Sequence, residues 1–125
     1  MAERQVSEAT EQTALFNWAR KARDEHPELA LMHHIPNGGT RNHVEAMRLK
    51  EQGVKSGVPD VCLPVPKGKY HALYIEMKRA DGGKVSEDQR AWINALNRVG
   101  NYAVVCHGYI EARETILKYL RGIDE

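Results

Sequence analysis

The sequence has few cysteines, no long apolar run and no excess of one charge. Its two cysteines, Cys62 and Cys106, lie in the apolar runs VCLPV and AVVCHG, and their spacing matches no zinc motif. We expect both to be reduced thiols in the core. No apolar run approaches the roughly 20 residues of a membrane helix. The first residues, MAERQVSEATEQ, also lack the apolar segment of a secretory signal. The sequence therefore predicts a cytoplasmic protein with no membrane partner.

The near balance of charge limits what bulk electrostatics can contribute. Eighteen Lys and Arg residues face 17 Asp and Glu residues, which gives a formal net charge of +1. A partner rich in phosphate would therefore have to meet a local basic patch, a bound cation or both. The 125 residues suit one domain, residues 1–125, and the 42% hydrophobic content is enough for a packed core.

Hydrophobic periodicity and turn residues divide the chain into predicted elements in the order helix, strand, helix, strand, strand, helix, strand, helix. Ser7 and Ser86 are expected to cap the first and third helices, and Gly53 and Gly100 to follow the ends of the second and third. The predicted bounds are 7–23, 29–35, 40–52, 60–65, 70–77, 86–99, 101–106 and 110–120. This order predicts an α/β fold, a mixed central sheet flanked by helices.

Side-chain placement follows from the same periodicity. In the second predicted helix, Val44 and Met47 are expected to face inward. Trp18 and Trp92 lie at helical positions with apolar neighbours and are expected to belong to the core.

Two acidic residues stand at neighbouring ends of two predicted strands. Asp60 opens one strand, and Glu76 and Lys78 close the next, in YIEMK. If the turn at 66–69 joins these strands as an antiparallel pair, the start of the first lies beside the end of the second. Side chains alternate along a strand, so Glu76 and Lys78 share one face while Met77 points to the other. Asp60 can then meet both.

Carboxylates this close repel each other, and a divalent cation removes that repulsion. Mg²⁺ prefers carboxylate, carbonyl and water oxygens, so Asp60, Glu76 and the backbone carbonyl of Met77 are candidate ligands. Such an ion can polarise a phosphodiester and hold an attacking water. Lys78 would lower the pKa of that water or neutralise charge that develops on the phosphate. The pattern therefore indicates metal-assisted phosphodiester chemistry.

Several runs of the sequence resemble the PD-(D/E)xK nuclease superfamily. They resemble its virus-type replication-repair nuclease (VRR-NUC) family more closely, especially the short phage-type members. The runs are SGVPDVCLPV, LYIEMK, SEDQRAW, SEATEQ and HHIPNGGTR, and the similarity extends from about residue 8 to residue 120. The resemblance implies a restriction-endonuclease-like core, dependence on Mg²⁺ or Mn²⁺, and hydrolysis of DNA. Stand-alone members look like dimeric, structure-specific enzymes that act on branched DNA such as four-way (Holliday) junctions.

The resemblance also implies roles for individual residues. Asp60, Glu76, Lys78 and Gln89 match the family's pattern. Gln89 stands three residues after Ser86, which is a capping-box spacing. A Gln engaged in a cap would be less free for chemistry, and the sequence leaves both roles open.

The family further implies an acidic residue on the first helix near the metal. Glu8 and Glu11 are the candidates, and both fall on the side of the helix that carries Leu15. Glu8 is slightly favoured because Gln12, at i+4, repeats a spacing typical of these nucleases. The alternative is that both are exposed acids that favour the helix N-terminus.

Three further residues are candidates for binding DNA. A glycine-rich turn that enters a helix can present N–H groups to phosphate, so Asn37 and Arg41 could hold the DNA backbone. Lys55 lies close to Asp60 in sequence and could contact a phosphate. A simple loop and a solvated surface are the competing interpretations.

Three functions compete on these observations. The first is a metal-dependent endonuclease for branched DNA, which we expect to be a two-fold homodimer because paired cuts need two sites. The second is a restriction-type or flap nuclease of the same fold, although so small a domain leaves little surface for reading bases. The third is a non-catalytic DNA-binding module.

Overall fold

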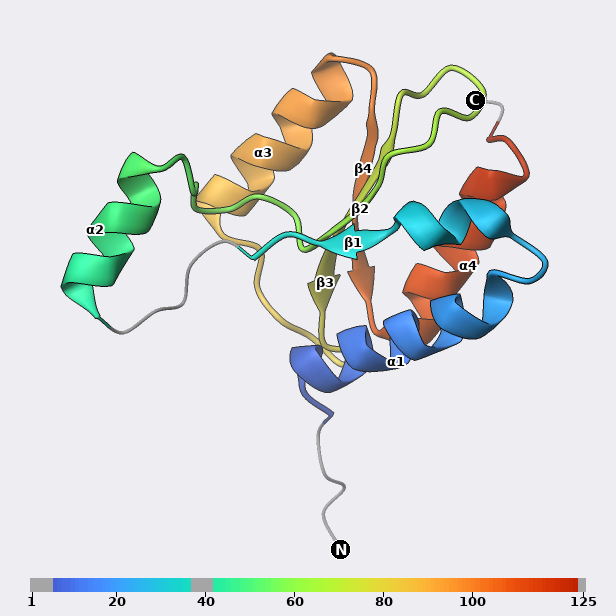
Figure 1. Ribbon diagram of the computed structural model, residues 1–125, viewed down its shortest axis with the longest axis horizontal. Coiled ribbons are helices and arrows are strands. Elements are labelled where there is room, and N and C mark those ends of the chain that lie inside the picture. The colour runs from blue at the N-terminus through green and yellow to red at the C-terminus, as the bar shows by residue number, and fades with distance from the viewer. Residues whose placement is uncertain (1–5, 37–41, 124–125) are drawn as a thin grey trace, which may run out of the picture.

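A computed structural model describes residues 6–36 and 42–123. Its elements are α1 (Glu8–Ala22), the 3-10 helix η1 (Pro27–Leu31), β1 (His33–His34), α2 (His43–Glu51), β2 (Val61–Leu63), β3 (Leu73–Lys78), α3 (Glu87–Arg98), β4 (Tyr102–His107) and α4 (Tyr109–Leu120). The strands form one sheet in the order β1-β2-β3-β4 (Figure 1). The first two pairings are antiparallel and β3 with β4 is parallel. The predicted α/β fold with a mixed sheet is confirmed.

The two faces of the sheet have different partners. Helices α1 and α4 cover one face, and α3, which connects the parallel strands β3 and β4, lies against the other (Figure 1). Leu73, Ile75 and Met77 alternate along β3 toward the first face, where they join the buried core with Leu15 and Ile116. The intervening residues of β3 therefore point to the α3 face, and these include Glu76 and Lys78.

Side-chain caps explain where three helices begin. The Ser7 hydroxyl accepts a hydrogen bond from the Thr10 N–H at 3.1 Å, and Ser86 caps α3 in the same way. The Asn42 side chain accepts from the N–H groups of Val44 and Glu45, so α2 begins at His43 rather than at residue 40. These contacts satisfy N–H groups that have no partner within the helix.

The strand predicted over 29–35 is wrong for its first half. Residues Pro27–Leu31 form a 3-10 helix with Pro27 at its start, and only His33 and His34 pair with β2. Proline favours this position because it has no N–H to satisfy and its φ is already near the helical value. Leu29 is buried from this helical turn, so its apolar character did not require a strand.

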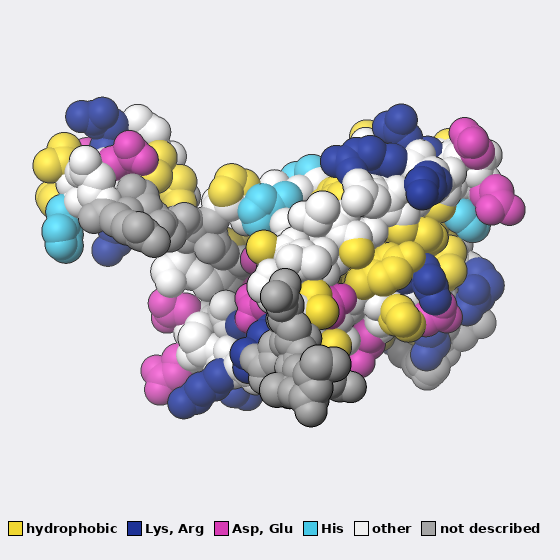
Figure 2. All heavy atoms as spheres, turned by 90° about the horizontal axis from the view of Figure 1, so that it is seen from below, with side chains coloured by type: hydrophobic (Ala, Val, Ile, Leu, Met, Phe, Trp, Pro, Cys, Tyr) yellow, Lys and Arg dark blue, Asp and Glu magenta, His cyan; other side chains and the backbone are white. Residues whose placement is uncertain are grey.

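The prediction that Val44 and Met47 face inward is also wrong. Helix α2 stands away from the body of the molecule (Figures 1 and 2), and these side chains are 65% and 63% exposed. Helical spacing indicates a helix but not whether another element covers its apolar side. Trp18 packs against the core, whereas Trp92 is half-buried and lines a surface hollow.

The remaining expectations from composition concern the thiols and the membrane. Cys62 and Cys106 are both buried and free, as expected for core thiols. None of the helices in the described ranges has the length and apolar character needed to span a bilayer.

Candidate active site

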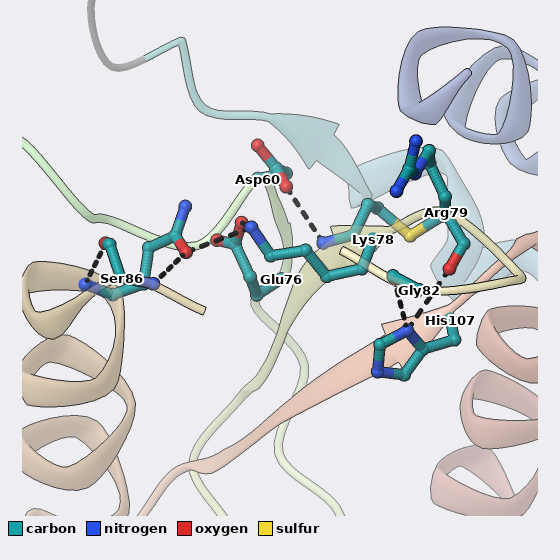
Figure 3. Close-up of polar contacts among 9 residues, drawn as sticks. Asp60, Glu76, Lys78, Arg79, Gly82, Ser86 and His107 are labelled. Carbon is teal, nitrogen blue, oxygen red and sulfur yellow. Dashed lines mark hydrogen bonds and ion pairs between the residues drawn. The ribbon is translucent and has the colours of Figure 1, made fainter. Parts of the chain in front are cut away.

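The pairing of β2 with β3 sets Asp60 beside Glu76. Val61 pairs with Ile75, so Asp60, which directly precedes β2, lies opposite Glu76. Residues directly opposite each other in an antiparallel pair point to the same face. One Asp60 oxygen, Oδ2, also accepts a hydrogen bond from the Met77 N–H at 2.8 Å (Figure 3). The hairpin therefore ends with two carboxyl groups side by side.

The loop that leads to Asp60 rests on the first turn of α3. Gly57 has φ +91°, and a Cβ there would come within 2.6 Å of the Asp88 backbone carbon. Only glycine permits this approach without strain. The same close contact fixes the start of α3, and hence Gln89, relative to Asp60.

Glu76 is a buried acid with an incomplete set of partners. Its side chain is almost inaccessible, since the residue is 2% exposed. Oε2 lies 3.5 Å from Lys78 Nζ, while the buried Oε1 has no hydrogen-bond partner among the described residues. Burial raises the pKa of Glu76 to about 8, and the negative charge of Asp60 adds to this effect while Lys78 opposes it.

Lys78 is held between an acid and an amide. Its ammonium group donates a hydrogen bond to Gln89 Oε1 at 3.0 Å as well as pairing with Glu76 (Figure 3). A Cβ at Gly83, where φ is +99°, would lie 3.2 Å from the Lys78 side-chain carbons. The loop backbone therefore packs closely on the aliphatic part of the lysine and fixes where its charge lies.

Gln89 takes part in the cap of α3 and also contacts Lys78. Its Oε1 accepts from the Ser86 N–H at 2.9 Å, while its own N–H donates to Ser86 Oγ at 3.1 Å, which completes a capping box. The same oxygen accepts from Lys78. An amide oxygen has two lone pairs, so the cap and the lysine contact coexist.

The two acids of α1, Glu8 and Glu11, do not form a metal-binding cluster with Asp60 and Glu76. Glu11 Oε1 accepts a hydrogen bond from the Tyr109 N–H at 2.8 Å, at the start of α4. Glu8 is exposed, and its carboxylate forms no hydrogen bond or ion pair with the part of the chain that the structure describes. A metal-directed role for either residue stays a prediction. Sequence reasoning missed the cap by Glu11. The available signal was Gly108 at the N-cap position of α4, because a glycine has no side chain to cap the helix and another residue must do so.

His107 is a second residue that sequence reasoning missed. Its Nδ1 lies 3.1 Å from the Arg79 carbonyl oxygen and 3.0 Å from that of Gly82 (Figure 3). Since both neighbours only accept, Nδ1 carries the hydrogen. His107 pairs with Lys78 across the parallel strands, so this contact ties the loop after β3 to the end of β4.

The residues predicted to bind DNA are only partly visible. Asn37 and Arg41 lie outside the described residues. Lys55 is exposed on the loop between α2 and Asp60, where it lines a hollow of about 440 Å³ together with Val58 and Trp92.

The carboxyl pair fits a hard divalent cation. No group of three His, Cys, Asp or Glu side chains suited to a metal occurs within the described ranges, but Mg²⁺ commonly uses one or two carboxylates and several waters. The unpartnered Glu76 Oε1 is an oxygen that needs a positive partner. In a strand, the N–H and C=O of one residue point to the same side. The Met77 carbonyl therefore points toward the side from which its N–H meets Asp60.

A mixed sheet that ends in an acid–acid–lysine set defines the class: a nuclease domain of the PD-(D/E)xK type. The VRR-NUC domain profile matches residues 2–109, so the chain belongs to the VRR-NUC family. A solved structure described as a VRR_NUC domain protein is similar, with a TM-score of 0.82 and 28% sequence identity. The match covers 94% of this chain and 91% of that one. No curated protein sequence matches.

Proposed function

We propose that this protein is a Mg²⁺-dependent endonuclease that hydrolyses phosphodiester bonds in DNA, with Mn²⁺ able to replace Mg²⁺. The observation that carries the proposal is the buried Glu76 carboxyl. It lies beside Asp60, and its Oε1 has no partner among the described residues. Burying a carboxylate without compensation is costly, and a cation shared with Asp60 removes that cost. Membership of a nuclease family supports the same interpretation.

Asp60, Glu76 and the Met77 carbonyl would hold the cation, which supplies Lewis-acid polarisation of the phosphate and a water of lowered pKa. Lys78 would stand beside the water as it adds to phosphorus and the bond to the leaving sugar oxygen breaks. Its ammonium group would stabilise the negative charge that develops on the phosphoryl oxygens. Gln89 would hold Lys78 in place through the 3.0 Å hydrogen bond.

Cleavage by point variants tests this proposal. Asp60→Asn keeps an oxygen for the Met77 N–H but removes the charge, so we expect Mg²⁺-dependent cleavage of labelled DNA to be lost while the protein still melts cooperatively. Asp81→Asn changes an exposed acid in the loop after β3 and serves as the matched control. Wild-type activity in Asp60→Asn would contradict the assignment.

The proposed substrate is branched DNA such as a four-way junction. The resemblance to stand-alone, structure-specific members of the family supports it, and so does the small size of the domain, which leaves little surface for reading a long base sequence. Cleavage of four-way junctions, flaps and linear duplex should be compared in Mg²⁺, Mn²⁺ and Ca²⁺. Preference for linear duplex would favour a restriction-type enzyme, preference for flaps a flap nuclease, and metal-dependent binding without turnover a non-catalytic module.

We propose that the protein works as a two-fold homodimer, because paired cuts across a junction need two sites. The uncovered apolar residues of α2, Val44 and Met47, are consistent with a protein contact at this helix. The measured mass in solution tests the dimer, and a monomeric mass at the concentration that cleaves junctions would contradict it.

A further inference from the structure

We infer that a groove between α1 and β1 binds the sugar–phosphate backbone of one DNA strand, next to the bond that is cleaved. This inference rests on the proposed nuclease function and specifies where the substrate lies. The groove has a volume of about 440 Å³ and is lined by Gln12, Thr13, Phe16, Arg20, Met32 and His34.

The chemistry of the lining suits an anionic chain with apolar sugars. Arg20, Gln12 and Thr13 supply hydrogen-bond donors, and the described residues that line the groove include no carboxylate. Phe16 and Met32 provide an apolar area that a deoxyribose can cover. Figure 2 looks at the molecule from the α1 side, where apolar side chains lie among Lys, Arg and His side chains and some Asp and Glu side chains. Donors around an apolar floor match the alternation of phosphate and sugar along a strand.

Arg20 is prepared for a phosphate. Its Nη1 donates to Asn17 Oδ1 at 3.0 Å, which orients the guanidinium group. The amide is neutral, and Arg20 forms no ion pair with any carboxylate in the described ranges. The positive charge therefore stays available while the side chain is already positioned, which reduces the entropy lost on binding.

The groove lies next to Asp60, because His34 of β1 contacts both. His34 lines the groove, and its Nδ1 lies 2.8 Å from the Asp60 carbonyl oxygen, which also accepts from the Ile35 N–H at 2.7 Å. A DNA strand lying in the groove would therefore contact His34, which is hydrogen-bonded to Asp60. The bound DNA backbone would then reach the main chain of the residue whose side chain carries the proposed catalytic carboxyl.

The direction of α1 indicates how the DNA strand runs. The start of α1 lies at the catalytic end of the sheet, because Glu11 caps α4 at Tyr109 and the neighbouring Gly108 N–H donates to the Lys78 carbonyl at 2.9 Å. From Gln12 to Arg20 the helix advances about 12 Å at 1.5 Å per residue. The bound strand would extend from the active site toward the basic last turn of α1, which contains Arg20 and Lys21.

The test compares Arg20→Gln with Arg23→Gln. Both arginines are exposed near the end of α1 and undergo the same change, but Arg23 does not line the groove. DNA binding is measured in Ca²⁺ at several salt concentrations, with the DNA checked for integrity. We expect Arg20→Gln to weaken binding on the order of tenfold. We also expect it to reduce the slope of log K against log salt by about 0.7 to 0.9, the value for one lost phosphate contact. Arg23→Gln should change neither.

Cleavage kinetics separate this inference from the proposed function. In Mg²⁺, Arg20→Gln should raise KM for DNA and leave kcat close to that of wild type, because Arg20 lies in the last turn of α1, at the end of the groove away from the active site. Equal affinities and equal salt slopes in the two arginine variants would overturn the groove, even if wild-type cleavage and its loss in Lys78→Ala supported the nuclease. If the wild-type protein never cleaved DNA, but Arg20→Gln weakened DNA binding and Arg23→Gln did not, the proposed nuclease function would be overturned. The inference about the groove would then still hold.

Discussion

The end of the sheet that carries Asp60, Glu76 and Lys78 and the α2 arm are built in opposite ways. At the sheet end, Lys78 is buried and is fixed by an acid, an amide and a close-packed glycine. In α2, no residue is buried, and the side chains of Val44 and Met47 are largely exposed. The first region has its geometry set by contacts within the chain, whereas the second is an isolated helix too short to be stable from propensity alone. The contrast is consistent with the chemistry proposed for the first region, and it leaves the apolar side chains of α2 uncovered by the other described residues.

The largest expected effect in the rigid region is on catalysis by Lys78. Lys78→Ala should reduce the rate of Mg²⁺-dependent DNA cleavage by at least about 100-fold, because it removes a charge placed beside the reacting phosphate. Single-turnover cleavage measures this loss. Lys84→Ala, at an exposed lysine of the following loop, is the control and should retain wild-type rates. Similar rates in both variants would show that the buried position of Lys78 has no catalytic purpose.

The next effect concerns the pH dependence of stability in metal-free protein. The pKa of Glu76 is raised from 4.5 to about 8 in the folded state, chiefly by burial. Between these values the folded protein binds the proton more tightly than the unfolded chain, so the free energy of unfolding falls as pH rises through this window. The limiting slope for one such group is about 1.4 kcal/mol per pH unit.

Glu76→Gln removes that titration because glutamine is neutral throughout. In EDTA, its free energy of unfolding relative to wild type should therefore increase steadily from pH 5 to pH 8, as measured by urea unfolding. Asp81→Asn, at an exposed acid, should give a curve parallel to wild type. If the curve of Glu76→Gln were also parallel, the buried acid would not be the source of strain that a cation relieves.

A smaller effect is expected where the loop before Asp60 meets α3. Gly57→Ala combines a positive φ with a clash against the Asp88 backbone, and should lower the free energy of unfolding by about 1–3 kcal/mol. Gly53→Ala is a matched control, because its φ is +108° but a Cβ there meets nothing within 4 Å. The difference between the two, measured by urea unfolding, isolates the packing contact from the backbone strain. Equal losses would mean that the close approach of loop and helix contributes nothing.

The sequence predicts the rigid region well because its determinants are local. A turn at 66–69 is enough to bring Asp60 to the end of β3 that carries Glu76, and the two-residue period of β3 puts Glu76 and Lys78 on the same face. The exact pairing of Asp60 with Glu76 does not follow from the turn, because the Lys67–Tyr70 bridge and the Val61–Ile75 pair differ in register by one residue. The capping box of Ser86 and Gln89 is likewise a pattern of four consecutive residues. Such features depend on hydrogen bonds between near neighbours, so one sequence is sufficient to infer them.

Features set by distant parts of the chain could not be predicted in the same way. Glu11 caps a helix 98 residues further on, and the His107 ring reaches carbonyl groups of the loop after β3. The exposure of α2 is a similar case, because periodicity shows which side of a helix is apolar but not what covers it. These outcomes depend on packing between elements, which local spacing does not encode.

The smallest effect on folding is expected in α2, and it tests the contrast between the two regions most directly. Val44→Ser and Met47→Ser should change the free energy of unfolding by less than about 0.5 kcal/mol, since both side chains are already exposed. Leu15→Ala, at a fully buried position of α1, should cost about 2–5 kcal/mol. If α2 forms the proposed homodimer contact, the α2 variants should lower the solution mass and the cleavage of junctions at low protein concentration, while the melting of the isolated chain is unchanged. Variants that keep the wild-type mass would assign the apolar side of α2 to some other partner.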